Sequence, residues 1–380
     1  MIATFFASIP AMIVLTGALV GLSAALLGTF LVLRGSAMLT DAISHSIVFG
    51  IIVVWLLTKQ VSGPVQLIGA GLTGVLTVVL TEALARSRLV KMDAAIGLVF
   101  PALFAAGVLL IGIYARQVHI DAHMVLLGEI GFVWLDTVVM GGVEVPRAVL
   151  VLSVMLLVNG LFVTLLWKEL KLATFDPALA AALGFLPGVV FYALLSLTSA
   201  TAVAAFDAVG AVLFIAFVVV PPATAFLLTD RLGRMIGIAA FVAVVSCGVG
   251  YALAVRWDVS IGGMMASMTG VCFTLALLFS PVQGIVAQVI RRQGQRLDND
   301  LRAMVVHLYT HQGTPDMEAE NTARALIEHL GWPPAKARAT ILRSLDRGLV
   351  RREGALLALS EQGDAMAREI YEPWSGQRGR

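Results

Sequence analysis

The sequence predicts an all-α polytopic membrane protein that ends in a small α+β winged-helix-like domain. Of its 380 residues, 59% are hydrophobic and only 13% are charged, and the mean hydropathy is +0.93. Soluble domains carry roughly 25% charged residues, so an ordinary soluble protein is excluded. The long apolar runs stop near Pro281. We expect a transmembrane domain over residues 1–285, a linker over 286–296, a winged-helix-like domain over 297–374 and a disordered tail over 375–380.

Apolar windows of about 18 to 25 residues are long enough to cross a bilayer as helices. Nine occur, and the N-terminal one is taken as a span because no basic segment of a signal peptide precedes it. The connecting loops fall into two alternating sets, which hold 11 and 4 basic residues. Because basic loops stay inside, we expect the N-terminus outside and the C-terminus in the cytoplasm. The predicted spans are residues 10–33, 36–58, 65–85, 94–114, 147–167, 184–200, 207–228, 234–254 and 262–280.

The stretch from Arg34 to Phe49 places Asp41, Ser44 and His45 inside the second predicted span. Asp41 and His45 are four residues apart, so a helix presents both on one face. Ionisable groups at this depth are costly and usually line a path or a pocket. A carboxylate with an imidazole suits Mn²⁺, Fe²⁺ or Zn²⁺ better than Ca²⁺ or Mg²⁺. We predict a metal path in which a second copy of the helix supplies two further ligands; the alternative is hydrogen bonding to neighbouring helices.

A polar segment over residues 115–146 separates the fourth and fifth predicted spans and is too polar to cross a bilayer. On an extended strand, its His119, Asp121 and His123 would lie on one side and could capture a metal ion. Asp207 stands near the outer end of its own predicted span. These four residues are candidates for an external entrance. The alternatives are a polar loop that contacts a partner or covers the pore mouth, and an Asp207 that reaches interfacial water.

The loop over residues 167–185 contains the signals of a short helix. An Asp-Pro pair supplies an N-cap and a proline at the first helical position, and a glycine ends the alanine-rich run that follows. Such a helix, parallel to the membrane on the inner face, could transmit force from another protein; the alternative is an ordinary connecting turn. The candidate residues are Asp176, Pro177, Ala178, Leu179 and Gly184.

The C-terminal part predicts three helices and a hairpin in the order of a winged helix-turn-helix. Residues 297–380 hold 11 basic and 12 acidic side chains, whereas a domain that neutralises phosphates is normally basic. This balance disfavours nucleic acid as a partner and favours a regulatory or partner-binding role. The expected elements are helices over 298–311, 317–330 and 334–347, a two-stranded wing over 348–360, and a last helix from about Glu361.

Four separated segments resemble the membrane subunits of the manganese, zinc and iron ABC importers. They follow the order found in that family, and the resemblance as a whole covers nearly all of residues 1–285, so it is specific. A further segment, LLGEIGFVWLD over residues 126–136, looks like the manganese-leaning, longer members that carry a winged-helix-like extension. The four segments are RGSAMLTDAISHSIVFG, KELKLATFDPALAAALGF, AVAAFDAVGAVLFIAFVVVPPATAFLLTDRL and MMASMTGVCFTLALLFSP.

The resemblance implies a permease subunit of the bacterial inner membrane that moves Mn²⁺, with Zn²⁺ or Fe²⁺ as alternatives, and holds no permanent cofactor. In that family the DAxSH segment is implicated in the metal path, which corresponds to Asp41 and His45. The FDP loop resembles the coupling helix that docks in the ATPase. The implied partners are a cytoplasmic ABC ATPase, a periplasmic metal-binding protein, and a second permease subunit that is identical or a sister. Thr40 departs from the pattern, since many relatives have glycine there, and would narrow the approach of a neighbouring helix.

The chain has no Gly-x-x-x-x-Gly-Lys-Ser/Thr motif and no Gly-Lys dipeptide. A phosphate-binding loop must therefore come from another polypeptide, and we expect a transport subunit rather than an enzyme. Two further hypotheses belong to other classes. One is an ATP-independent secondary metal transporter or channel, which would need no docking helix. The other is a membrane-anchored winged-helix regulator.

Overall fold

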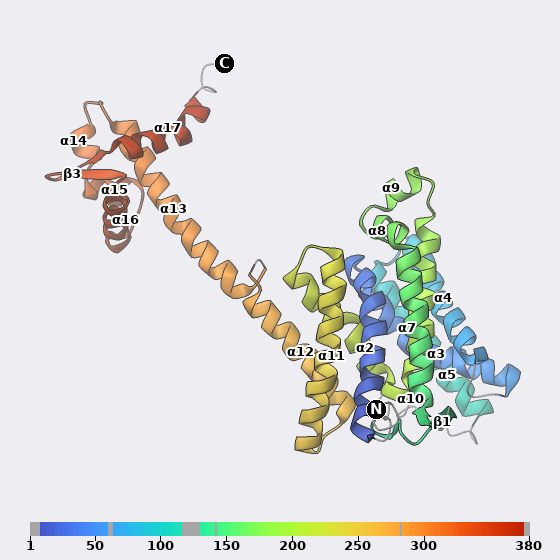
Figure 1. Cartoon of the computed structure of the whole chain (residues 1–380). Helices are drawn as coiled ribbons and strands as arrows, with labels where there is room; N and C mark the ends of the chain where they lie inside the picture. Colours follow the sequence, from blue (N-terminus) through green and yellow to red (C-terminus); the bar gives the residue numbers. More distant parts are fainter. Residues whose placement is uncertain (1–7, 60–63, 116–129, 141–142, 282, 376–380) are drawn as a thin grey trace. The chain divides into compact units, whose positions relative to one another are not determined.

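The computed structural model describes residues 8–59, 64–115, 130–140, 143–281 and 283–375. The chain divides into two compact units, Met1–Gly284 and Ile285–Arg380, which we call unit 1 and unit 2 (Figure 1). The side chains of a few residues inside the described ranges, including that of Asp207, are not described. Each unit is treated by itself below.

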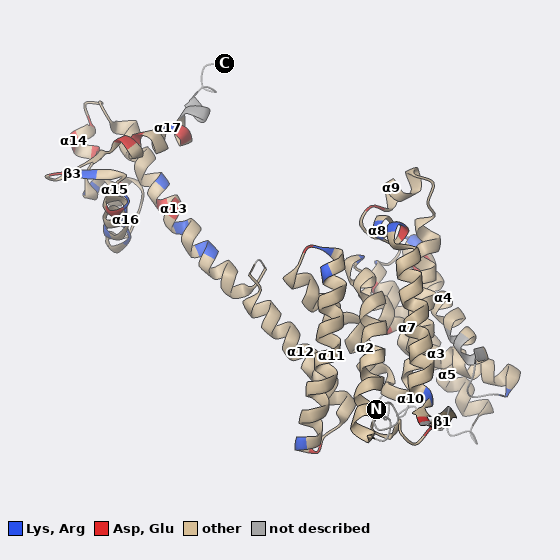
Figure 2. Ribbon diagram, in the orientation of Figure 1, with Lys and Arg blue, Asp and Glu red and all other residues tan. Residues whose placement is uncertain are grey.

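Unit 1 is built from long helices, as expected of a chain whose backbone polar groups must be satisfied without water. Most of its charged side chains lie near helix ends, where they can reach an aqueous boundary (Figure 2). The helices of unit 1 are α2 (Ile9–Leu33), α3 (Ala37–Thr58), α4 (Pro64–Arg86), α5 (Met92–Tyr114), α7 (Arg147–Leu165), α8 (Trp167–Phe175), α9 (Pro177–Ala182), α10 (Pro187–Leu228), α11 (Leu232–Trp257) and α12 (Ile261–Phe279).

Eight described helical segments are long and apolar enough to cross a membrane, one fewer than the nine predicted spans. Helix α10 contributes two of the eight, Pro187–Phe206 and Ala208–Leu228. Within the second of them, Gly210 adopts φ 74° and ψ 168° and interrupts the helical backbone. The predicted third span coincides with α4, which is not among the eight. Several side chains of α4 lie outside the described part of the structure, and the eight are counted over the described residues alone. Helix α4 nevertheless packs against α3, α5 and α10 within unit 1.

The core of unit 1 forms around α2, which packs against α7, α10 and α11. Phe30 of α2 and Phe214 and Phe217 of α10 are fully buried. The two helices approach closely because α2 has Gly28 at the crossing, where a β-carbon would overlap the backbone carbonyl of Val218. Helix α3 packs on a second group formed by α4, α5 and α10, so α10 belongs to both groups.

A short hairpin lies between α5 and α7. A 3₁₀ turn, η1 (Ile130–Phe132), precedes strands β1 (Thr137–Met140) and β2 (Val143–Pro146), which pair antiparallel with Thr137 opposite Pro146. The turn η1 contacts α2, α10 and α12, so it is anchored to the helices. The described part of the predicted polar segment is thus a structured connection between two spans.

Unit 2 contains a small helical core with an antiparallel hairpin. Its buried residues include Met304, Leu308, Leu326, Trp332 and Ile341. The predicted second helix is two short helices, because Thr322 leaves the helical conformation and its Oγ1 accepts a hydrogen bond from the backbone of Ala325 at 3.2 Å. The elements are α13 (Ile285–His311), α14 (Met317–Glu320), α15 (Ala323–His329), α16 (Pro334–Asp346), β3 (Val350–Glu353), β4 (Leu356–Leu359) and α17 (Glu361–Ser375).

The hairpin of unit 2 pairs Val350 with Leu359 and Glu353 with Leu356. A separate bridge joins Thr322 to Leu356, so the start of α15 is held against the hairpin. Residues 286–296, which we predicted as a linker, are helical and belong to α13. Helix α13 packs on α14, α16, α17 and β4.

The close crossing of α2 and α10 predicts that Gly28→Ala destabilises unit 1. The added methyl group would overlap the carbonyl of Val218, and overpacking of this kind costs about 1–3 kcal/mol. Gly160→Ala on α7 is the matched control, because a β-carbon there meets no atom within 4 Å. The unfolding temperature is measured on the detergent-solubilised chain, as the temperature at which heating removes its monodisperse peak in size-exclusion chromatography. Equal unfolding temperatures for the two variants would contradict the crossing.

Candidate functional site

Helix α3 presents an acid and an imidazole on one stripe of its surface. Oδ1 of Asp41 lies 3.4 Å from Nε2 of His45, because residues four apart share a helix face. Their side chains are 40% and 31% exposed, whereas Ile43 and Ile47 on the other side of the helix are fully buried. The polar pair is therefore accessible from outside the protomer, within a helix of membrane-spanning length.

Helix α5 forms an aromatic wall beside the imidazole. The ring of Phe100 stacks on His45 with centroids 5.7 Å apart, and Phe104 meets it edge-on at 6.3 Å. The two helices come close because α5 has Gly107, where a β-carbon would lie 2.8 Å from the backbone nitrogen of Phe49. These contacts restrict the orientation of the His45 ring, whereas the side chain of Asp41 stays partly exposed.

The opposite face of α3 is anchored by hydroxyl groups. Ser46 Oγ and Thr77 Oγ1 of α4 are hydrogen-bonded at 2.6 Å, and Ser44 Oγ donates to the carbonyl of Thr40 at 2.8 Å. Thr40 itself is fully buried, so the residue that stands in place of glycine lies inside the helix packing. Rotation of the Asp41–His45 stripe inward would break the Ser46–Thr77 contact with α4, whereas the Ser44 hydrogen bond lies within α3.

The described residues of unit 1 do not complete a metal shell around Asp41 and His45. In the part of unit 1 that the structure describes, no third His, Cys, Asp or Glu joins Asp41 and His45 in a cluster with ligand geometry. The pair can supply one carboxylate oxygen and one imidazole nitrogen to a divalent ion. A stable shell needs about four ligands, so the remaining ones have to come from water or a second chain.

The predicted entrance residues are not brought to this site by any described contact. His119, Asp121 and His123 fall outside the described residues. Asp207 lies on α10, but its side chain is also outside the described part of the structure. Their role therefore stays a prediction.

The short helix α9 forms as the sequence predicts. Oδ1 of Asp176 accepts a hydrogen bond from the backbone of Leu179 at 2.9 Å, and Pro177 occupies the first turn. The helix ends where Gly184 takes φ +87° and the amide of Phe185 donates to the carbonyl of Ala180 at 3.0 Å. Local capping thus determines both ends of α9.

Four large apolar side chains around α9 are exposed although they belong to an ordered segment. The exposed fraction is 59% for Phe175 and Leu183, 46% for Leu179 and 67% for Leu186. Ala180 faces the other way and is fully buried. Exposed apolar groups gathered on an ordered, capped helix are typical of a surface that another protein covers.

An ionic network that we did not predict lies between α3, α4, α8 and α10. Arg34 Nη1 donates to the carbonyl of Ala173 at 3.4 Å, and its guanidinium carbon lies 3.9 Å from the ring centre of Phe191. It thereby connects the residues before α3 to α8, which leads directly to α9. The signal for this contact in the sequence was Arg34, directly after the first predicted span. Its charge had been used only to orient the spans in the membrane.

Glu82 belongs to the same region and is paired. Its carboxylate accepts a hydrogen bond from Arg86 at 2.7 Å and another from the hydroxyl of Tyr192. Because Tyr192 lies on α10, this contact ties α4 to α10. Such a pairing between distant residues has no signature in sequence spacing.

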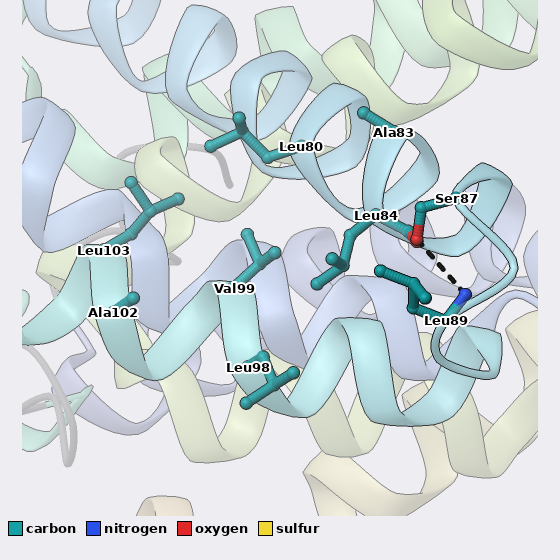
Figure 3. Close-up of a pocket in the computed structure, with 9 residues that line it drawn as sticks. All are labelled: Leu80, Ala83, Leu84, Ser87, Leu89, Leu98, Val99, Ala102 and Leu103. Atoms are coloured by element: carbon teal, nitrogen blue, oxygen red, sulfur yellow. Dashed lines mark hydrogen bonds between the residues drawn. The ribbon is translucent and has the colours of Figure 1, made fainter.

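An apolar groove of about 600 Å³ lies between α4 and α5. Figure 3 shows leucine side chains of both helices converging on it, including Leu80, Leu84 and Leu103. Its polar lining residue is Ser87, whose Oγ accepts a hydrogen bond from the backbone of Leu89 at 3.3 Å. This lining offers no ligand set for a metal ion, so the Asp41–His45 stripe remains the candidate site.

Comparison with known proteins places the chain in a family. A model of the ABC 3 transport family matches residues 8–280. The zinc transport system membrane protein TroD of Treponema pallidum is 43% identical over 93% of this chain and 97% of its own length. The manganese transport system membrane protein MntD of Bacillus subtilis is 46% identical over 75% of this chain and 96% of its own length.

A solved structure shows the same architecture. PsaBC from Streptococcus pneumoniae, in complex with a Fab, aligns with a TM-score of 0.62 and 25% sequence identity. The alignment covers 74% of this chain and 98% of the other. The matched family model covers well over half of the residues, with unit 1 almost entirely included. The chain therefore belongs to the ABC 3 transport family.

Proposed function

We propose that the chain is the membrane permease subunit of an ATP-driven importer of divalent transition metal ions. The observation that carries the proposal is the accessible Asp41–His45 pair on α3, in a family whose relatives are named as zinc, manganese and chelated-iron transport proteins. The protein would lie in the inner membrane of a bacterium, with its N-terminus outside and its C-terminus in the cytoplasm, as the loop charges favour.

The metal path would form between two permease subunits, each of which supplies one Asp41 and one His45. Together they give two carboxylates and two imidazoles around one ion. The exposure of both side chains in the single protomer supports this arrangement, because a second α3 could reach them. At about 1.5 Å per residue, His45 lies about 12 Å along α3 from Ala37, within a hydrocarbon core about 30 Å thick. At that depth ligands have to replace the water that the ion loses.

The favoured ion is Mn²⁺, with Zn²⁺ and Fe²⁺ as alternatives. An oxygen and nitrogen ligand set accepts all three, since geometry and availability determine selectivity more than ligand type does. Among the relatives, MntD is named for manganese and TroD for zinc at similar identity. The ion is cargo in this proposal, so Asp41 and His45 have to release it again. An incomplete and partly exposed site is suited to such release.

ATP would be hydrolysed by a separate cytoplasmic ABC ATPase that docks on α9. The exposed apolar side chains around this helix provide the surface, and the buried Ala180 anchors it to unit 1. The contact of Arg34 with the carbonyl of Ala173 gives a direct mechanical connection from α8 to the start of α3. Movement of the docking helix would therefore shift the helix that carries the ligands.

A periplasmic metal-binding protein would deliver the ion to the outer mouth. We propose His119, Asp121, His123 and Asp207 as the entrance, on the basis of their residue types and predicted side of the membrane. Unit 2 is proposed to be a winged-helix-like cytoplasmic domain, because four helices, of which α14 and α15 replace the predicted second one, precede an antiparallel hairpin as helices do in that fold. Its near-neutral charge favours a regulatory role over binding nucleic acid.

Replacing either ligand should abolish transport without preventing assembly. Asp41→Asn and His45→Gln each remove the ability to hold the ion at mid-membrane, so uptake of radioactive Mn²⁺ by cells that express the transporter should fall to background. Asp258→Asn, the same chemical change at an exposed cap of α11, is the control and should transport normally. Copurification of the ATPase verifies assembly. Normal uptake by both ligand variants would refute the proposed path.

Disrupting the apolar surface around α9 should prevent docking of the ATPase. Leu183→Asp places a charge on a side chain that is 59% exposed and unimportant for the core, so the chain should still fold. We expect loss of the P-loop ATPase that copurifies with the wild-type chain, identified by mass spectrometry. Val259→Asp, at a comparably exposed position between α11 and α12, is the control. Equal recovery of the ATPase with both variants would argue against docking at α9.

A further inference from the structure

Unit 2 gathers two imidazoles and a carboxylate at one point. His307 lies on α13, Glu320 ends α14 and His329 ends α15, and one ligand atom from each lies within 4.8 Å of the other two. Nε2 of His307 is 4.0 Å from Oε2 of Glu320, and Nδ1 of His329 contacts the same oxygen. Three separate helices therefore converge on one carboxylate oxygen.

The backbone around Glu320 is held in place on both sides. Its amide donates to the carbonyl of Asp316 at 2.9 Å, and its own carbonyl lies 3.2 Å from Nε2 of His307. The next residue, Asn321, donates through Nδ2 to the carbonyl of Leu308 at 3.3 Å and accepts from the amide of Leu357 at 2.8 Å. The carboxylate is thus positioned by contacts that do not involve its own oxygens.

The carboxylate oxygen at the centre of the cluster is not satisfied by hydrogen bonds. Oε2 of Glu320 is buried and makes no hydrogen bond within the described residues, although His329 contacts it. The side chain of Glu320 is 19% exposed and that of His307 is 8% exposed. A buried anionic oxygen that imidazole nitrogens approach without forming a hydrogen bond is costly, and a cation at this point would relieve the cost.

The chemistry of the cluster selects the kind of cation. Two imidazoles with one carboxylate form a ligand set suited to Zn²⁺ and other divalent transition ions, and three protein ligands leave a position for water. His311, whose ring centre lies 4.8 Å from that of His307, stands beside the cluster as a further imidazole.

We propose that His307, Glu320 and His329 form a binding site for one divalent transition metal ion in unit 2. The site uses none of the residues assigned to the transmembrane path. If Nε2 of His307 coordinates the ion, it gives up its contact with the carbonyl of Glu320. The ion then joins α13, α14 and α15, which are otherwise held by the apolar core and the Asn321 contacts.

The alternative hypothesis without a metal ion is that a protonated His329 forms an ion pair with Glu320. It predicts no stoichiometric binding of zinc, so a binding measurement separates the two. The test uses the full-length chain in detergent, stripped with a chelator, in a background that lacks the other candidate imidazole ligands and the pathway acid. The background carries Asp41→Asn, His45→Gln, His119→Gln and His123→Gln.

Titration calorimetry with Zn²⁺ should show one equivalent bound by this background, and Co²⁺ should give an absorption spectrum typical of nitrogen and oxygen ligation. Glu320→Gln and His329→Gln should each remove the equivalent. Glu328→Gln is the matched control, because its exposed carboxylate pairs with Arg324 on the same helix, and it should bind normally. His329 is half-exposed, so His329→Gln leaves the core of unit 2 intact, as unchanged fluorescence of Trp332 verifies.

Absence of a zinc equivalent in the background, or its retention in both Glu320→Gln and His329→Gln, would overturn the proposed site. Because the measurement is made without transport, its failure is distinguishable from failure of the proposed permease function. The result of the transport assay on the Asp41 and His45 variants likewise does not depend on metal binding by unit 2.

Discussion

Ionisable side chains within a membrane-spanning helix are costly, and α3 carries both Asp41 and His45. The organisation of unit 1 follows from how this cost is met. Hydroxyl contacts and buried isoleucines fix one side of α3 against its neighbours. The other side keeps the two ionisable groups together, 3.4 Å apart and partly exposed. A polar stripe of this kind needs water, an ion or a second subunit beside it.

The Asp41–His45 stripe of α3 is connected to α9, the helix on which the ATPase is proposed to dock. Arg34 precedes α3 and binds the carbonyl of Ala173 near the end of α8, while its guanidinium packs on Phe191 of α10. Helix α9 follows at once, capped at its start by Asp176 and ended by Gly184. Glu82 joins α4 to Tyr192 of α10 in the same region. A small displacement of α9 would therefore pass through packed and hydrogen-bonded groups rather than through a flexible loop.

Unit 2 combines two sources of stability that differ in kind. An apolar core around Trp332 and Leu308 holds α13, α15 and α16 with the hairpin. The polar groups around Glu320 instead constrain α14, which has no buried residue of its own. Small helical domains commonly need an additional constraint where the core is thin, and a bound ion is one such constraint. The relative TroD matches nearly the whole of this chain, including unit 2.

Much of the architecture was predictable because its causes are local. Apolar runs long enough to cross a membrane indicate helices, four-residue spacing puts Asp41 and His45 on one face, and the Asp176-Pro177 pair caps α9 whatever surrounds it. The same local signals could not show that residues 286–296 continue α13.

Only the tertiary structure decided which distant groups meet. The pairing of Glu82 with Tyr192, the packing of Phe100 on His45 and the convergence of His307, Glu320 and His329 all join residues from different helices. Their positions depend on how helices cross, which small residues such as Gly107 permit but do not specify in the sequence. Periodicity determines the face on which a side chain lies, whereas packing of whole helices determines what that face contacts.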